Sequence, residues 1–210
     1  MASTRDRLVT EGMRLFGELG YSATSVAQIE AAAGLSPGSG SLYKHFRSKE
    51  ALLTEGLDRV LSGRRQLADL LSARDPDRPD DQLIAVGRLA LQRMDEDRDV
   101  SRLLFRGLQS FPQLLQRFGT EEIAAIHQAT ATMLADLAGA DTAEKVDWEA
   151  VAVVLQGAVA HYWLLADLFG KHPSGVDEDR LVAAVAGVAA AMTAAPHTES
   201  KPKNQPRKKK

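Results

Sequence analysis

Residues 34–46 carry the side chains of this chain that are best suited to an anionic surface. The segment reads Gly34-Leu35-Ser36-Pro37-Gly38-Ser39-Gly40-Ser41-Leu42-Tyr43-Lys44-His45-Phe46. Only Leu42 and Phe46 have the character of core residues. Small hydroxyls, bare backbone and a cation near a helix start can all reach phosphate oxygens, because N–H groups at a helix N-terminus point toward an anion. The segment therefore predicts contact with a phosphate-bearing partner.

The composition of the chain is that of a globular protein. Its 210 residues are 44% hydrophobic, enough for a full core in one large or two small domains. The absence of cysteine excludes disulfides and thiolate metal sites, and the polar start Met1–Asp6 lacks the apolar core of a signal peptide. We therefore predict a cytoplasmic protein.

Motifs for catalysis are missing from the sequence. The histidines stand at positions 45, 127, 161, 172 and 197, with no His-x-x-x-His or Glu-x-x-His pair, and no nucleophile elbow or nucleotide-binding loop is present. We accordingly expect no enzyme activity, no metal site and no cofactor.

The net charge of -2 hides an asymmetry along the chain. Six of the 26 basic residues lie at or after Lys201, which leaves 20 basic against 28 acidic residues, about -8, before it. Residues 197–210 are predicted to form a basic disordered tail, either simply solvated or a nonspecific DNA anchor. An acidic body is compatible with DNA binding, because only the face that meets phosphates must be basic.

Apolar residues recur at helical spacing almost throughout, so we predict an all-α fold. Ser3 or Thr4 can cap a first helix that ends at Gly20, and Thr24 or Ser25 can cap a second that ends at Gly34. A third helix near Ser39–Phe46 would turn Leu42 and Phe46 inward. Three such helices form a helix-turn-helix domain over residues 1–50, whose last helix would enter the major groove of DNA.

Residues 51–196 are predicted to form a second, helical domain. Ser48 can cap a helix of about 25 residues that stops before the prolines at 76 and 79. Further helices are expected at Gln82–Glu96, Asp99–Gln109, Pro112–Leu137 with a break at Gly119-Thr120, Trp148–Phe169 and Glu178–Ala195. No apolar run fits a membrane span of about 20 residues.

The last two predicted helices have faces of small side chains, which let helices approach closely. Paired with a second copy they would form a four-helix contact, whereas in the alternative they pack within one monomer. The residues expected at the interface of a homodimer are Val154, Gly157, Ala158, His161, Ala184, Gly187, Val188 and Ala191.

Bulky apolar residues and a few polar ones in the second domain could line a ligand pocket, although a plain core would use the same residue types. The candidates are Met94, Phe105, Gln109, Phe111, Phe118, His127, Met133, Gln156, Tyr162 and Trp163. The expected ligand is a small, apolar effector.

The N-terminal motifs together resemble the DNA-binding domain of the TetR (tetracycline-repressor) family of bacterial regulators. The resemblance covers about the first 55 residues and rests on Gly20-Tyr21, Thr24-Ser25-Val26, Ile29, Ala33-Gly34-Leu35-Ser36, Leu42-Tyr43-Lys44-His45-Phe46 and Ser48-Lys49-Glu50-Ala51-Leu52-Leu53. It implies a homodimer that binds a palindromic site on double-stranded DNA, most often as a repressor, and that a small-molecule inducer releases.

The resemblance also implies roles for individual residues. Tyr43, His45 and Lys49 would hold phosphates, and Thr24 or Ser25 would support the backbone contact from the second helix. Ser39, Gly40, Ser41 and Lys44 would face base edges, and Ser36 completes the predicted DNA-binding set.

One feature departs from the family pattern. Five residues, Pro37 to Ser41, stand between Ser36 and Leu42 where the family usually has about three, which either lengthens the turn or extends the recognition helix.

Two other functions are compatible with the sequence. One is a DNA-binding dimer without an effector, and the other is a helical small-molecule-binding or enzymatic domain with an N-terminal docking unit.

Overall fold

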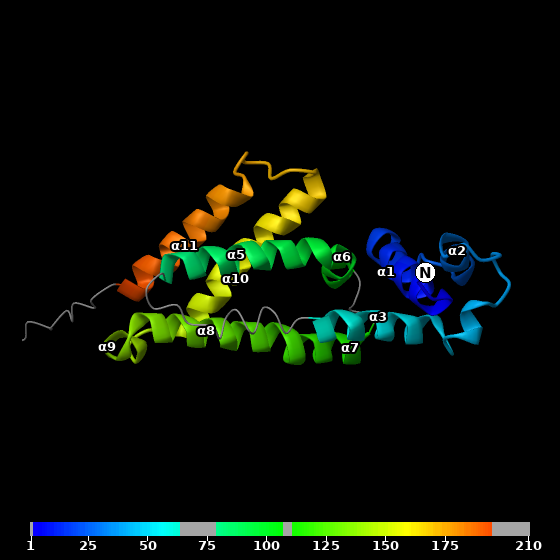
Figure 1. The fold of residues 1–210 in the computed structure, drawn as a ribbon, viewed down its shortest axis with the longest axis horizontal. Coiled ribbons are helices and arrows are strands. Elements are labelled where there is room, and N and C mark those ends of the chain that lie inside the picture. The colour runs from blue at the N-terminus through cyan, green and yellow to red at the C-terminus, as the bar shows by residue number, and fades with distance from the viewer. Residues whose placement is uncertain (1, 64–78, 107–110, 195–210) are drawn as a thin grey trace, which may run out of the picture.

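The computed structural model describes residues 2–63, 79–106 and 111–194, and every regular element within them is helical, as predicted. Figure 1 shows the N-terminal helices gathered at one end of the molecule and the later helices forming the rest. The predicted tail 197–210, the expected helix beyond residue 63 and Gln109 lie outside the described residues.

The N-terminal domain begins with three elements, α1 (Thr4–Leu19), α2 (Val26–Ala32) and the short 3₁₀ helix η1 (Leu42–Lys44). Ser3 caps α1 in a reciprocal capping box with Asp6, and Gly20 follows the helix with φ 85°. The boundaries of α1 agree with the sequence prediction.

Helix α3 (Lys49–Gly63) follows η1 and runs from the N-terminal domain into the second domain (Figure 1). The hydroxyl of Ser48 accepts a hydrogen bond from Ala51 N at 3.0 Å, so Ser48 caps this helix as expected.

The second domain contains the remaining helices. They are α5 (Pro79–Glu96), α6 (Arg98–Arg106), α7 (Pro112–Phe118), the π-helical turn η3 (Gly119–Ile123), α8 (Ala124–Ala138), α9 (Ala140–Ala143), α10 (Trp148–Phe169) and α11 (Glu178–Ala194). The break predicted at Gly119-Thr120 coincides with η3. The structure starts α5 at Pro79 rather than Gln82, because proline lacks only an N–H that the first helical turn leaves unpaired anyway.

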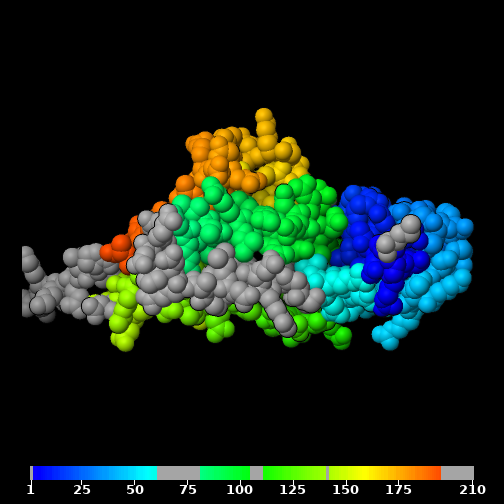
Figure 2. Space-filling view, in the orientation of Figure 1, coloured from blue at the N-terminus to red at the C-terminus, as the bar shows by residue number. Residues whose placement is uncertain are grey.

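A single apolar core joins the start of α3 and part of α6 to the N-terminal helices. Leu52, Leu53 and Leu57 of α3 are buried in it, together with Val100 and Leu103 of α6. The predicted boundary after residue 50 therefore crosses α3, whose first turns pack with the N-terminal domain. Figure 2 shows the two domains in continuous contact.

Helix α10 is long and apolar enough, by length and composition alone, to cross a membrane, and among the described residues no other helix is. Its inward side chains include Trp148, Leu155 and Trp163, which are buried in the core of the second domain. Its other faces include exposed residues such as Val154 and Ala158.

Candidate functional site

The predicted recognition segment is a long turn that ends in one turn of 3₁₀ helix. Gly38 and Gly40 both adopt positive φ, at 72° and 71°, where a side chain would be strained. The extra residues thus lengthen the turn, and the helix expected over Ser39–Phe46 is reduced to Leu42–Lys44. Pro37 and the two glycines are poor helix formers, which explains the shortening.

Two apolar side chains and one buried carboxylate hold this short helix in place. Leu42 and Phe46 are buried, as predicted. Glu30 on α2 is 0% exposed, and its Oε1 accepts a hydrogen bond from Leu42 N at 2.9 Å. Glu30 therefore satisfies a backbone donor at the start of η1, where a helix has no partner of its own for it.

Glu30 was not among the functional residues predicted from the sequence, although its position in the sequence pattern could have indicated it. Glu30 lies four residues after Val26, so both share the helix face that was expected to point inward. A carboxylate on a buried face needs a donor, and this requirement could have identified it.

Most of the residues predicted to contact DNA lie on the surface around η1 and the start of α2. Ser25, Ser36, Ser39, Tyr43 and Lys44 are exposed, and Gly40, Ser41 and His45 are partly exposed. Tyr43 is the most apolar of them and has 58% of its surface exposed. The hydroxyls of Ser39 and Ser41 lie 2.7 Å apart and hydrogen-bond to each other.

Of the two residues expected to support the backbone contact, Ser25 lies on the surface and Thr24 is buried. It is 1% exposed, and its hydroxyl donates toward the carbonyls of Leu15, at 3.1 Å, and Gly20, at 2.9 Å. Ser25 is the residue that caps α2, through a reciprocal box with Gln28. A buried hydroxyl between two carbonyls cannot reach a phosphate, so Thr24 joins α1 to the loop before α2.

Lys49 also differs from its predicted role as a direct phosphate contact. Its ammonium donates to the carbonyls of Tyr21, at 2.7 Å, and Thr24, at 2.6 Å, and lies 4.1 Å from the centre of the Tyr21 ring. Partial burial lowers the pKa of Lys49 below its ordinary value. Lys49 thus fixes the loop that precedes α2 to the start of α3.

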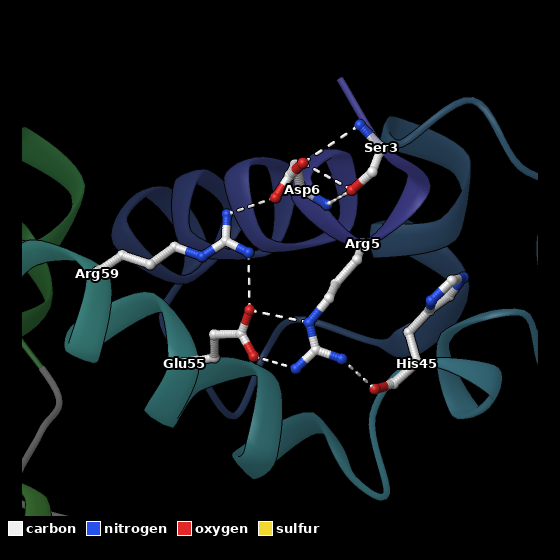
Figure 3. Close-up of polar contacts among 6 residues, drawn as sticks. All are labelled: Ser3, Arg5, Asp6, His45, Glu55 and Arg59. Carbon is white, nitrogen blue, oxygen red and sulfur yellow. Dashed lines mark hydrogen bonds and ion pairs between the residues drawn. The ribbon is translucent and has the colours of Figure 1, made fainter. Parts of the chain in front are cut away.

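A network of charged side chains joins the start of α1 to α3 (Figure 3). Arg5 forms a bidentate pair with Glu55, whose second partner is Arg59 at 2.7 Å, and Arg59 contacts Asp6 at 3.0 Å. Arg5 also donates to the carbonyl of His45 at 2.9 Å. The hydrogen bond from Arg5 is the main cause that lowers the pKa of Glu55.

The His45 imidazole points away from Arg5 in Figure 3, so the network uses only the backbone of His45. Arg5 also stacks on the ring of Phe46, at 4.4 Å from its centroid. Arg5 therefore supports the chain directly after η1. Arg47, which follows Phe46 and was not predicted as a contact, is exposed beside these residues.

The second domain contains a cavity of about 410 Å³. Five of the predicted pocket residues line it, namely Met94, Phe118, His127, Met133 and Gln156. The others do not. Tyr162 and Trp163 are buried beside it and hydrogen-bond to Val176 O and Asp95, because a buried phenol or indole needs a polar partner.

Phe111 is also absent from the cavity wall, because it packs edge-on against Tyr21, 4.4 Å between ring centroids, at the junction with the N-terminal domain. The side chain of Phe105 lies outside the described residues.

The residues predicted to form a dimer interface share one property in the monomer. Val154, Gly157, Ala158, His161, Ala184, Gly187, Val188 and Ala191 are all exposed. They lie on α10 and α11, which contact each other (Figure 1). Gly157 also lines the cavity. Along the described residues, no group of three or more His, Asp or Glu could hold a metal ion.

Comparison with known proteins agrees with this geometry. Residues 8–55 match the family described as "Bacterial regulatory proteins, tetR family". A stretch of 53 residues is 40% identical to the uncharacterized HTH-type transcriptional regulator YerO of Bacillus subtilis, covering 25% of this chain and 18% of that protein. A stretch of 56 residues is 45% identical to the HTH-type transcriptional repressor KstR2 of Mycolicibacterium smegmatis, covering 27% and 26%.

These sequence matches thus span only about a fifth to a quarter of the curated relatives. The fold match is much longer. The regulator PfmR of Thermus thermophilus superposes with a TM-score of 0.63 over 94% of this chain and 100% of that chain, at 22% identity. At this identity the likeness establishes the fold of both domains.

Proposed function

We propose that the chain belongs, through its N-terminal domain, to the tetR family of bacterial regulatory proteins and that it is a ligand-responsive transcriptional repressor. In this proposal a homodimer binds a palindromic operator, and a small molecule in the second domain releases it. The observation that carries the proposal is the exposed polar surface around Tyr43, which is held by the buried Glu30 of α2 and by the hydrogen bond from Arg5 of α1 to the carbonyl of His45.

The proposed DNA contacts follow from exposure. Tyr43, His45 and the cation Arg47 face phosphates, while Ser39, Ser41 and Lys44 face base edges, with Gly40 allowing close backbone approach. Ser25 and Ser36 add small donors at the margin. Thr24 and Lys49 support this surface from inside the domain.

A homodimer would cover the exposed small residues of α10 and α11. Two-fold symmetry places the same helix pair of a second copy against them, so that both copies bury the same face. Two recognition segments would then be presented to two half-sites, which is why a palindrome is expected.

The cavity favours a protein that responds to a ligand over an effector-independent one. Its roughly 410 Å³ fall within the range of small-molecule sites, about 300–1,000 Å³. Helix α6 places Ser101 and Leu104 in the cavity wall and Val100 and Leu103 in the N-terminal core. A ligand that displaces α6 would therefore move a helix that packs directly on α1.

Repression is proposed rather than activation because one relative, KstR2, is named as a repressor. A DNA-binding regulator works where the chromosome is, so we place the protein in the cytoplasm. Catalysis is not part of the proposal.

The test is a gel-shift and footprinting titration on the DNA that flanks the protein's own gene. We expect protection of a palindrome, with affinity that falls as salt rises. Tyr43→Ala should weaken binding to all sequences, whereas Lys44→Ala should change the preferred sequence.

Lys145→Ala provides the matched control, because Lys145 is an exposed lysine of the second domain. It should leave both affinity and preference unchanged. Failure to protect any duplex at low salt would refute the proposal.

A further inference from the structure

The cavity walls are almost entirely apolar but contain one group of neutral polar side chains. Residues from α5, α6, α7, η3, α8, α10 and α11 form the wall, and most are Leu, Val, Ile, Ala or Met. A volume of about 410 Å³ lies within the range of small-molecule sites, about 300–1,000 Å³. The cavity therefore has room for a small apolar molecule.

The wall contains one charged side chain of each sign, Arg93 and Glu122. Arg93 forms an ion pair with Glu96 at 3.2 Å, and Glu122 is only 5% exposed. An anionic ligand would therefore compete with Glu96 for Arg93 and would lie in a low-dielectric space that already contains the Glu122 carboxylate, which is unfavourable.

Gln156 and Thr130 form a hydrogen-bonded pair on opposite helices of the wall. Gln156 Nε2 donates to Thr130 Oγ1 at 2.7 Å and to the carbonyl of Ile126 at 3.2 Å. A carbonyl can only accept, so these contacts fix which end of the amide is nitrogen. Both amide hydrogens are used, and the amide oxygen remains as an acceptor.

The pair leaves one acceptor and one donor for a ligand. Among the described residues the structure shows no donor to Gln156 Oε1, and Thr130 Oγ1, which accepts from Gln156, still has its own hydrogen to donate. His127 lies three residues before Thr130 on α8 and also lines the cavity, so its ring adds a further polar group on the same face.

We propose that the cavity binds a neutral hydrophobic alcohol or phenol whose hydroxyl lies at Gln156 and Thr130. A hydroxyl both donates and accepts, so it satisfies Gln156 Oε1 and the Thr130 hydroxyl together. A carbonyl or ether can only accept and leaves Oε1 without a donor. A carboxylate has the same defect and adds a charge. The inference rests on the proposed function only in treating this cavity as the effector site.

A matched ligand series tests the proposal without DNA. Displacement of the neutral fluorophore 1-aminoanthracene from the full chain is measured with 1-decanol, decyl methyl ether and decanoate. We expect 1-decanol to bind about 10-fold more tightly than its methyl ether, because the ether leaves a buried acceptor unpaired. Decanoate should bind more weakly still.

Replacement of Gln156 tests whether the hydroxyl of the ligand lies at this residue. Gln156→Leu should bring 1-decanol to the affinity of its methyl ether. Because this variant also loses the bond to Ile126, its folding is checked by thermal unfolding, and Thr130→Val provides a second reading of the same preference. Equal affinity of the alcohol and ether for the wild-type chain, or tighter binding of decanoate, would overturn the proposal.

Failure of this inference can be told apart from failure of the proposed function. Tight 1-decanol binding with no effect on operator affinity would support the ligand class and refute the ligand response. Operator binding by a chain that accepts none of the three probes would overturn the ligand class and leave DNA binding intact.

Discussion

The recognition segment and the cavity are built on opposite principles. The recognition segment is a continuous piece of chain, residues 34–46, and buried polar groups hold it from behind, above all Glu30. The cavity is assembled from six α-helices and the turn η3, spread over residues 83–189, and apolar packing shapes it. In the recognition segment a buried polar contact fixes the position of the chain, whereas in the cavity a few polar groups remain available to a ligand.

The two regions should therefore differ in how well they tolerate substitutions. A buried carboxylate with a backbone partner tolerates little change, because its removal leaves an N–H group unpaired. An apolar wall tolerates swaps of similar volume. We therefore expect the largest effects on DNA binding from residues that never touch DNA.

Replacement of Glu30 tests the comparison most severely. Glu30→Leu leaves the Leu42 N–H without an acceptor, which costs about 1–3 kcal/mol, and releases the start of η1. We expect operator affinity, measured by fluorescence anisotropy, to fall by about 10-fold or more. Circular dichroism should retain the helical spectrum, because the rest of the core is unchanged.

Glu30→Gln is the matched control, since its amide oxygen can still accept from Leu42. Its operator affinity should stay within a few-fold of the wild type. Wild-type affinity in Glu30→Leu would show that the buried carboxylate does not position the segment.

The same difference explains what the sequence could reveal. Ser3 and Ser25 cap helices and Gly20 follows the end of one, and such capping depends only on neighbouring residues. These helix ends and the DNA-binding motif were therefore predictable. Thr24 and Lys49 were assigned to the surface because a residue type does not show which carbonyls lie nearby. The cavity wall could not be separated from the core, because Met133 and Trp163 follow the same helical periodicity, yet only Met133 lines it.

Gly17 lies at the contact between α1 of the N-terminal domain and α6 of the second domain. A Cβ built on Gly17 of α1 would lie 2.8 Å from backbone atoms of Asp99 on α6, which cannot move aside as a flexible side chain would. Gly17→Ala should therefore lower stability by about 1–3 kcal/mol through overpacking. That corresponds to a melting temperature lower by a few degrees, as measured by calorimetry.

Because α6 also lines the cavity, Gly17→Ala should alter the ligand's effect on operator affinity. Gly119→Ala is the control, since its φ of -60° suits any residue and nothing lies within 4 Å of its added Cβ. It should leave stability equal or slightly raised. Identical melting temperatures for the two variants would mean that α1 and α6 are not held at this contact.

The smallest expected effect comes from Asp99 itself and depends on pH. Burial raises the pKa of Asp99, against attraction by Arg102. The folded state therefore holds this proton more tightly, so its stabilising contribution is complete below the unfolded-state pKa and is lost as pH rises through the folded-state pKa. Asp99→Asn should raise the melting temperature at pH 7 slightly, and the gain should shrink as pH falls toward 4.

Asp95, close in sequence at the end of α5, provides a contrast of opposite sign. Burial opposes its ionisation, but hydrogen bonds from Arg98 and Trp163 hold the pKa of Asp95 below its ordinary value. Its contribution is present above the unfolded-state pKa and is lost as pH falls through the folded-state pKa. Asp95→Asn should therefore lower the melting temperature at pH 7. A shift of the same sign in both variants would contradict the difference in their surroundings, and with it the view that α6 carries a partly buried, unfavourable charge at its contact with α1.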